Sequence, residues 1–116
     1  VLLPVIIRSH SPVISVFSVG GNQSSPYQTA DDTPAFVLTT DRNAACRISQ
    51  TDTNFSSMTW GCAGDGSLVH TCTAPVTFAP GNHIIYASCR DAAGIENNSS
   101  NNEDIPFTVV APTPTT

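Results

Sequence analysis

Residues 79–94 read APGNHIIYASCRDAAG and contain the clearest structural signal in the chain. The Pro80-Gly81-Asn82 group is typical of a turn, and the β-branched and aromatic residues that follow it are typical of a strand. Similar runs, separated by turn-forming residues, recur at 13–19, 35–40, 45–49, 57–60, 68–73 and 105–110. No apolar stripe of ten or more residues has helical spacing. We therefore expect an all-β sandwich of about seven short strands.

The strand runs define the domain organisation. Residues 12–110 are expected to form one domain, because about seven strands in roughly 100 residues is the pattern of an immunoglobulin-like or fibronectin-like β-sandwich. Residues 1–11 are an N-terminal extension, and residues 111–116 are a Pro/Thr-rich linker or tail that favours extended conformations. The chain begins at Val1 without a basic leader, so we expect a processed form or a fragment.

The composition argues against an intracellular enzyme. The 116 residues carry a net charge of −5, only 11% of them are charged, and none is lysine. A basic surface for nucleic acid or an anionic membrane is therefore missing, and lysine-dependent chemistry is excluded. The longest apolar run is too short to span a bilayer. Ser, Thr and Asn supply the polar surface, which suits a secreted protein.

Cysteines and glycosylation motifs also favour an extracellular or cell-surface location. Two structural disulfides are the simplest interpretation of an even cysteine count without a C-x-x-C pair, and they imply an oxidising compartment. Four cysteines allow three pairings, and sequence alone does not choose among them. Four Asn-X-Ser sequons mark candidate glycosylation sites. The cysteines are Cys46, Cys62, Cys72 and Cys89, and the sequons begin at Asn22, Asn54, Asn97 and Asn98.

Several of these stretches resemble a known family. FVLTT at 36–40, ACRIS at 45–49, PGNHIIYASCRDAAG at 80–94 and IPFTV at 105–109 resemble a widespread immunoglobulin-like module of prokaryotic surface proteins. That module combines a Cys-Arg-x-Ser strand with a strand that ends in Cys-x-Asp-x-x-Gly. The resemblance covers roughly residues 12–110 and implies an immunoglobulin-like fold. It says little about function, because such modules serve as spacers, adhesin segments and fibre subunits alike.

The resemblance also implies a disulfide pairing. Cys46 and Cys89 would join two neighbouring strands, which leaves Cys62 and Cys72 to close a Gly-rich hairpin. The chain departs from the family pattern by adding this second pair and by carrying Ile95 where the family often has Asn. All four cysteines are expected to be structural rather than reactive.

No pattern in the sequence supports catalysis. A nucleophile elbow of the G-x-S-x-G type is missing, and His10, His70 and His83 lie far apart and outside any H-E-x-x-H motif. His83 follows a turn at the start of a strand, where we expect a solvated edge position. The chain is therefore not expected to be an enzyme or to bind a cofactor.

Acidic residues could in principle bind calcium, which prefers several carboxylate and carbonyl oxygens. The candidates are the Asp31-Asp32 pair and Asp91 with Glu96, but neither matches an EF-hand loop. Asp91 is better explained as the cap of the turn that ends at Gly94, where a short carboxylate can accept backbone N–H groups. We therefore expect no metal site.

Three aromatic residues offer an alternative binding function. Trp60, Tyr27 and Tyr86 could form a platform on which sugars stack, as in a carbohydrate-binding module. Trp60 lies two residues from Cys62, and an aromatic ring beside a disulfide is common in sandwich cores. A core role for Trp60 is therefore the favoured interpretation.

The N-terminal segment is unusually apolar for this chain. It comprises Val1, Leu2, Leu3, Pro4, Val5, Ile6 and Ile7, and every residue except Pro4 is a candidate donor-strand residue. Three interpretations compete: a first strand of its own sandwich, a remnant of a signal or hydrophobic anchor, and a donor strand that inserts into a neighbouring subunit.

The function expected from the sequence is structural. The leading hypothesis is a subunit of an extracellular filament or pilus, whose partners are copies of itself and whose coupling element is the donor strand. The alternatives are a spacer or adhesion module of a larger cell-surface protein, and a carbohydrate-binding module.

Overall fold

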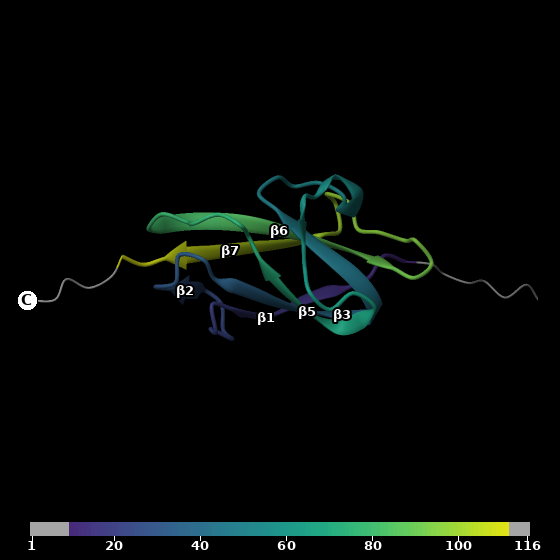
Figure 1. Cartoon of the computed structure of the whole chain (residues 1–116), viewed down its shortest axis with the longest axis horizontal. Helices are drawn as coiled ribbons and strands as arrows, with labels where there is room; N and C mark the ends of the chain where they lie inside the picture. Colours follow the sequence, from purple (N-terminus) through teal and green to yellow (C-terminus); the bar gives the residue numbers. More distant parts are fainter. Residues whose placement is uncertain (1–9, 112–116) are drawn as a thin grey trace, which may run out of the picture.

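The computed structural model describes residues 10–111, which form an all-β domain and confirm the expected fold class. Residues 1–9 and 112–116, which include the candidate donor strand and most of the tail, lie outside the described part (Figure 1). The elements are β1 (Ile14–Val19), β2 (Tyr27–Thr29), β3 (Ala35–Ser49), the 3₁₀-helix η1 (Phe55–Ser57), β4 (Trp60–Gly61), β5 (Ser67–Thr73), β6 (Gly81–Asp91) and β7 (Glu103–Val109).

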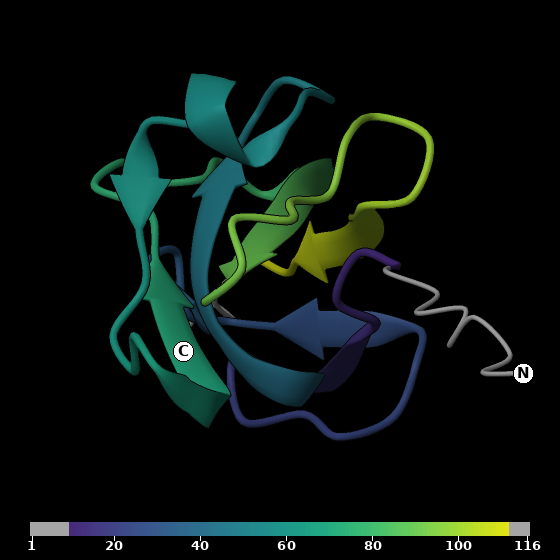
Figure 2. The ribbon, with the colours of Figure 1, turned by 90° about the vertical axis from the view of Figure 1, so that its right-hand side faces the viewer.

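The seven strands form one sheet that folds over itself. The strand order is β1-β3-β6-β7-β2, and β4 and β5 also pair with β3. The first part of β3 pairs with β1 and β5, and the part from residue 44 onward pairs with β6 and β4. Because β3 bends between these two parts, it contributes to both layers of a sandwich that is nearly barrel-shaped (Figures 1 and 2).

The continuity of β3 corrects the sequence-based prediction of two strands separated by a turn at residues 41–43. Polar residues at this bend are bonded rather than left to solvent. The Asp41 N–H donates to the Val13 carbonyl over 3.2 Å, and the Thr40 hydroxyl donates to the Arg42 carbonyl over 2.7 Å. The first bond attaches the bend to the residue just before β1 and the second closes the bend itself, so the polar residues mark a corner within the strand.

Two further elements differ from the prediction. The expected strand at 57–60 is reduced to Trp60, the first residue of β4, because Ser57 ends η1 and the two residues between them belong to no regular element. The N-cap of η1 is Asn54, whose Oδ1 accepts the Ser57 N–H over 3.2 Å. The short β2 was not predicted, and it pairs with β7 in parallel. The remaining predicted strands are present with boundaries that differ by a few residues.

The core lies between the layers and follows the period-2 alternation of the strands. On β3, alternate residues are buried, and Phe36, Leu38 and Ile48 are completely inaccessible to solvent. The ring of Phe107 on β7 meets Phe36 and Phe78 edge to face, with both centroid separations at 5.1 Å. This geometry is favourable for aromatic pairs and links the two layers.

Two disulfides reinforce this core. Cys46 on β3 lies directly opposite Cys89 on β6 and is bonded to it, and both residues are buried. Cys62, just after β4, is bonded to Cys72 on β5. This is the pairing that the family resemblance implies.

Candidate functional site

The described chain begins and ends at opposite ends of the domain (Figure 1). His10 lies near the loop between β6 and β7, because the Asn101 side chain of that loop donates to the hydroxyl of Ser11 over 2.7 Å. At the other end, the Val110 N–H donates to the Thr29 carbonyl next to β2 over 2.8 Å. The two ends are therefore the candidate sites at which this domain connects to whatever precedes and follows it.

Arg42 binds the first residues of the described chain to the domain. Its guanidinium donates to the His10 carbonyl over 2.7 Å and to a carboxylate oxygen of Asp91 over 3.1 Å. It also lies 3.3 Å from the Asp41 carboxylate, whose other oxygen accepts the Val13 N–H over 2.9 Å. The bend of β3, the end of β6 and the start of the chain thus meet at one guanidinium.

The charges of this cluster support each other. The Val13 N–H is the main cause that lowers the pKa of Asp41, with Arg42 adding to the effect. The Ile95 N–H is the main cause that lowers the pKa of Asp91, again with a contribution from Arg42. Hydrogen bonds to the charged form stabilise it, so both carboxylates stay ionised and remain available to the guanidinium at neutral pH.

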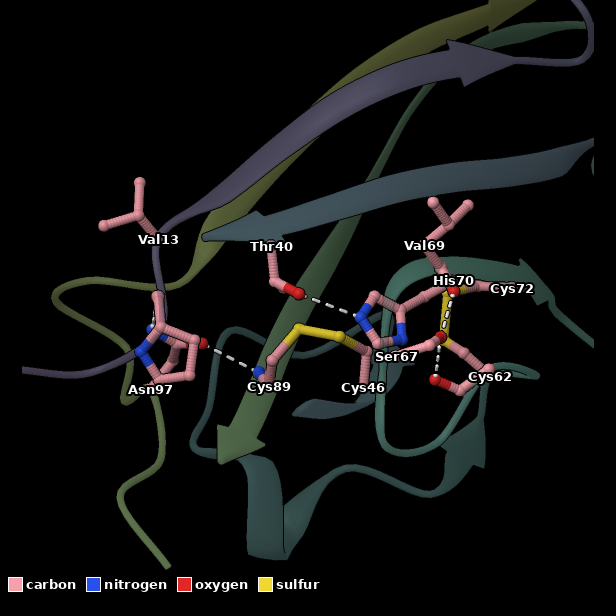
Figure 3. Close-up of a disulfide and its surroundings, with 12 residues drawn as sticks. Val13, Thr40, Cys46, Cys62, Ser67, Val69, His70, Cys72, Cys89 and Asn97 are labelled. Atoms are coloured by element: carbon pink, nitrogen blue, oxygen red, sulfur yellow. Dashed lines mark hydrogen bonds between the residues drawn. A yellow bond between two sulfur atoms is a disulfide. The ribbon is translucent and has the colours of Figure 1, made fainter. Parts of the chain in front are cut away.

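Asn97 fastens the same segment from the interior (Figure 3). It is completely buried. Its Oδ1 accepts the Cys89 N–H over 2.7 Å, and its Nδ2 donates to the carbonyls of Pro12 over 2.8 Å and Asn101 over 3.3 Å. One side chain therefore joins β6, the β6–β7 loop and the start of the chain.

This arrangement corrects the assignment of Asn97 as a glycosylation site. An N-linked glycan is attached through Nδ2, and here Nδ2 is buried and directed at two carbonyl groups. A glycan at Asn97 is incompatible with this fold. Among the other sequon residues, Asn98 is exposed, whereas Asn22 and Asn54 are half-buried.

A second buried polar group, His70 on β5, was not identified as buried from the sequence. The Thr40 hydroxyl already donates to Arg42, so it accepts from His70 Nε2–H, 3.0 Å away. Burial lowers the pKa of His70, which keeps the ring neutral. Figure 3 shows the ring directed toward Thr40 in the interior that also holds the Cys46–Cys89 disulfide. The alternation of β5, which puts His70 on the face of Cys72, was the signal that could have found it.

The three histidines are not brought together. His10 lies at the start of the described chain, His70 is in the core, and His83 packs its ring against Phe107 with a centroid separation of 5.5 Å. His83 also donates from Nε2 to the Ala79 carbonyl over 2.6 Å, so it is half-buried at the edge of the sheet rather than fully solvated. Packing against two aromatic rings outweighs hydration here.

The acidic candidates for calcium hold backbone and side-chain groups instead. Oδ1 of Asp91 accepts the N–H groups of Ala93 and Ile95 over 3.0 and 2.9 Å, which confirms the predicted turn cap. Glu96 accepts from the Ser56 hydroxyl over 2.8 Å. Within residues 10–111, no three His, Cys, Asp or Glu side chains are grouped so that they could hold a metal ion.

The proposed aromatic platform is not formed. Trp60 lies opposite the buried Ile48 and packs against the core, as does Tyr27 on β2. Tyr86 on β6 lies opposite Ser49, one position further along β3, and therefore on the other face of the sheet. The three rings do not share a surface.

The predicted donor-strand residues, Val1 to Ile7, lie outside the described residues. Among the described strands, β1 pairs only with β3 and has one unpaired edge. Two apolar residues of this region are exposed: Val13, just before β1, at 56% and Phe17, on β1, at 53%. Within the described range, no helix is both long enough and apolar enough to cross a membrane.

Comparison with known proteins adds no family assignment. No protein-family model matches the chain, and no curated protein is similar enough in sequence to count as a relative.

Proposed function

We propose that the chain is a structural module of an extracellular assembly, without catalytic activity, that is joined to its neighbours at its two ends. The observation that carries this proposal is that the described part of the chain begins and ends at opposite ends of the domain (Figure 1). A module with this layout adds length to an assembly without folding the chain back on itself.

The fastening of the N-terminal end supports the proposal. Arg42 and Asn97 together bind the carbonyls of His10 and Pro12, so the position of these first described residues on the domain is fixed. A module that is joined to a neighbour at this end needs its first residues in a fixed position, whereas a domain without neighbours does not. The two disulfides agree with an oxidising, extracellular setting.

The form that the geometry favours is a spacer or adhesion module within a larger surface protein. Phe36, Ile85 and Ile105 are already fully buried in the seven-stranded fold. A donor strand that completes a core normally fills an apolar groove left by a missing strand. Since these core residues are not exposed, coupling through covalent linkage at the two ends is the simpler arrangement.

A tandem protein tests this proposal. Two copies of residues 1–116 are joined end to end, and the maximum dimension is measured by small-angle X-ray scattering. We expect an extended particle, and we expect an Arg42→Gln substitution in the second copy to broaden its distance distribution because the junction is loosened. A compact tandem, with the two copies folded side by side, would contradict the proposal.

The second candidate is the homopolymeric filament, favoured by the apolar segment from Val1 to Ile7 together with the unpaired edge of β1. In this form the segment would add to that edge beside Val13 and Phe17. Electron microscopy of the full chain and of a chain lacking residues 1–7 separates the two candidates. Filaments in the full chain alone favour the polymer, and single particles in both samples favour the spacer.

A further inference from the structure

A shallow groove lies beside Trp60, where the end of β3, the loop after it and η1 meet β4. Its volume is about 350 Å³, within the range of small-molecule sites. The lining residues are Ser49, Gln50, Thr51, Thr53, Ser57, Thr59 and Trp60.

The lining is rich in hydroxyl groups and carries no charge. Within the described part of the chain, the side chains of Thr51, Ser57 and Thr59 make no hydrogen bond to another residue, and all three residues are exposed. Arg47 is not among the lining residues, and its guanidinium lies 4.3 Å from the centre of the Phe55 ring. Hydroxyl donors and acceptors are therefore available to a ligand, but no charge is available to bind an anion.

Trp60 supplies an apolar surface at the same place. Trp60 is half-buried, packs against the core and also lines the groove. An aromatic side chain next to several hydroxyl groups without hydrogen-bond partners is complementary to a pyranose ring. Such a ring has an apolar C–H face and a rim of hydroxyl groups. The lining without charge excludes uronic and sialic acids as preferred ligands.

We propose that the groove formed by Trp60 and the hydroxyls of Thr51, Ser57 and Thr59 binds a neutral saccharide. This site differs from the three-ring platform considered from the sequence, because Trp60 is its only aromatic residue and hydroxyl groups provide its polar contacts. It does not rest on the structural role proposed above: a spacer or a filament subunit can each carry it on its side.

The sequence provides its own reporter, since Trp60 is the single tryptophan of the chain. Tryptophan fluorescence of the full chain is titrated separately with three neutral probes: cellotriose, maltotriose and triacetylchitotriose. We expect a saturable change with at least one probe, with a dissociation constant in the millimolar range because the groove is open. An acidic probe, sialyllactose, should give at least a severalfold weaker response.

Paired variants locate the binding site. The Ser57→Ala/Thr59→Val double variant removes two groove hydroxyls that bind no other residue, so it should fold normally and bind about tenfold more weakly. The Ser15→Ala/Thr39→Val double variant removes two hydroxyls from β1 and the first half of β3 and should bind like the original chain. The proposal is overturned if no neutral probe gives a saturable change, or if the groove variant titrates like the original chain.

Discussion

Asn97 is the side chain whose removal should cost this domain most among its polar residues. Replacing it with alanine leaves two buried groups without partners, the Cys89 N–H and the Pro12 carbonyl. Cys89 is 0% exposed and Pro12 is among the fully buried residues, so water does not replace the lost bonds in the folded state. An unsatisfied buried group costs about 1–3 kcal/mol, so the two together predict a loss of about 2–6 kcal/mol in unfolding free energy.

Asn98 provides a matched control, because it is the same residue type one position later and is exposed. Its Oδ1 accepts only the Ser100 N–H, over 2.8 Å. Asn98→Ala should therefore cost no more than about 0.5–1 kcal/mol. Urea unfolding followed by Trp60 fluorescence gives both values under one set of conditions.

A second substitution tests the direction of the hydrogen bonds. Asn97→Asp keeps an acceptor for the Cys89 N–H but loses the donor to Pro12 unless the carboxyl is protonated. Burial raises the pKa of such a carboxyl above its unfolded value, so protonation favours the folded state. The stability deficit of Asn97→Asp relative to the original chain should therefore shrink between pH 7 and pH 4. If Asn97→Ala costs no more than Asn98→Ala, or if the Asp deficit does not depend on pH, the reasoning is wrong.

Three further predictions follow from the disulfides and the titrating groups. From the sequence separations of 43 and 10 residues, removing Cys46–Cys89 should cost about 4 kcal/mol and removing Cys62–Cys72 about 3 kcal/mol, measured by urea unfolding of the paired Cys→Ser variants; the opposite order would contradict the loop-entropy argument. Because burial lowers the pKa of His70, the unfolded chain binds more protons, so stability should fall as pH drops below about 6.5, and His70→Gln should flatten that dependence. Because the Ile95 N–H and Arg42 lower the pKa of Asp91, the ionised Asp91 stabilises the fold above about pH 4, and this stabilisation is lost as pH falls through the lowered pKa. In Asp91→Asn, the unfolding free energy should therefore depend less on pH in this acidic range. An unchanged dependence would argue against the role of Asp91.

The sequence predicted the strands well where a run of strand-forming residues lies between clear turn signals. The run at 83–90 and the run at 68–73 both correspond to strands, because each is rich in β-branched or aromatic residues and lies between turn residues. β2 was missed because three residues between Ser and Pro clusters carry too little periodicity. The corner in β3 was missed because Asp41 and Arg42 look like turn residues until their partners on other strands are known.

The candidate site shows the same limit more clearly. Asp91 could be assigned from the sequence because its partners, the N–H groups of Ala93 and Ile95, lie within four residues. Asn97 could not, because its Nδ2 binds the Pro12 carbonyl, 85 positions away. Its sequon was a local signal that competed with this distant one. Contacts that close over long sequence separations are determined by the packed fold, which no local pattern encodes.

The Cys46–Cys89 bond has a mechanical consequence for a module pulled at its two ends. Tension enters through the start of β1 and leaves through the end of β7, and it pulls these strands lengthwise in opposite directions (Figure 1). If the domain unfolds under tension, the segment between Cys46 and Cys89 cannot be extended, because the disulfide carries the tension directly from β3 to β6. The second disulfide lies inside that enclosed loop. The domain would therefore act as an elastic tether whose extension stops well short of the full contour of the chain.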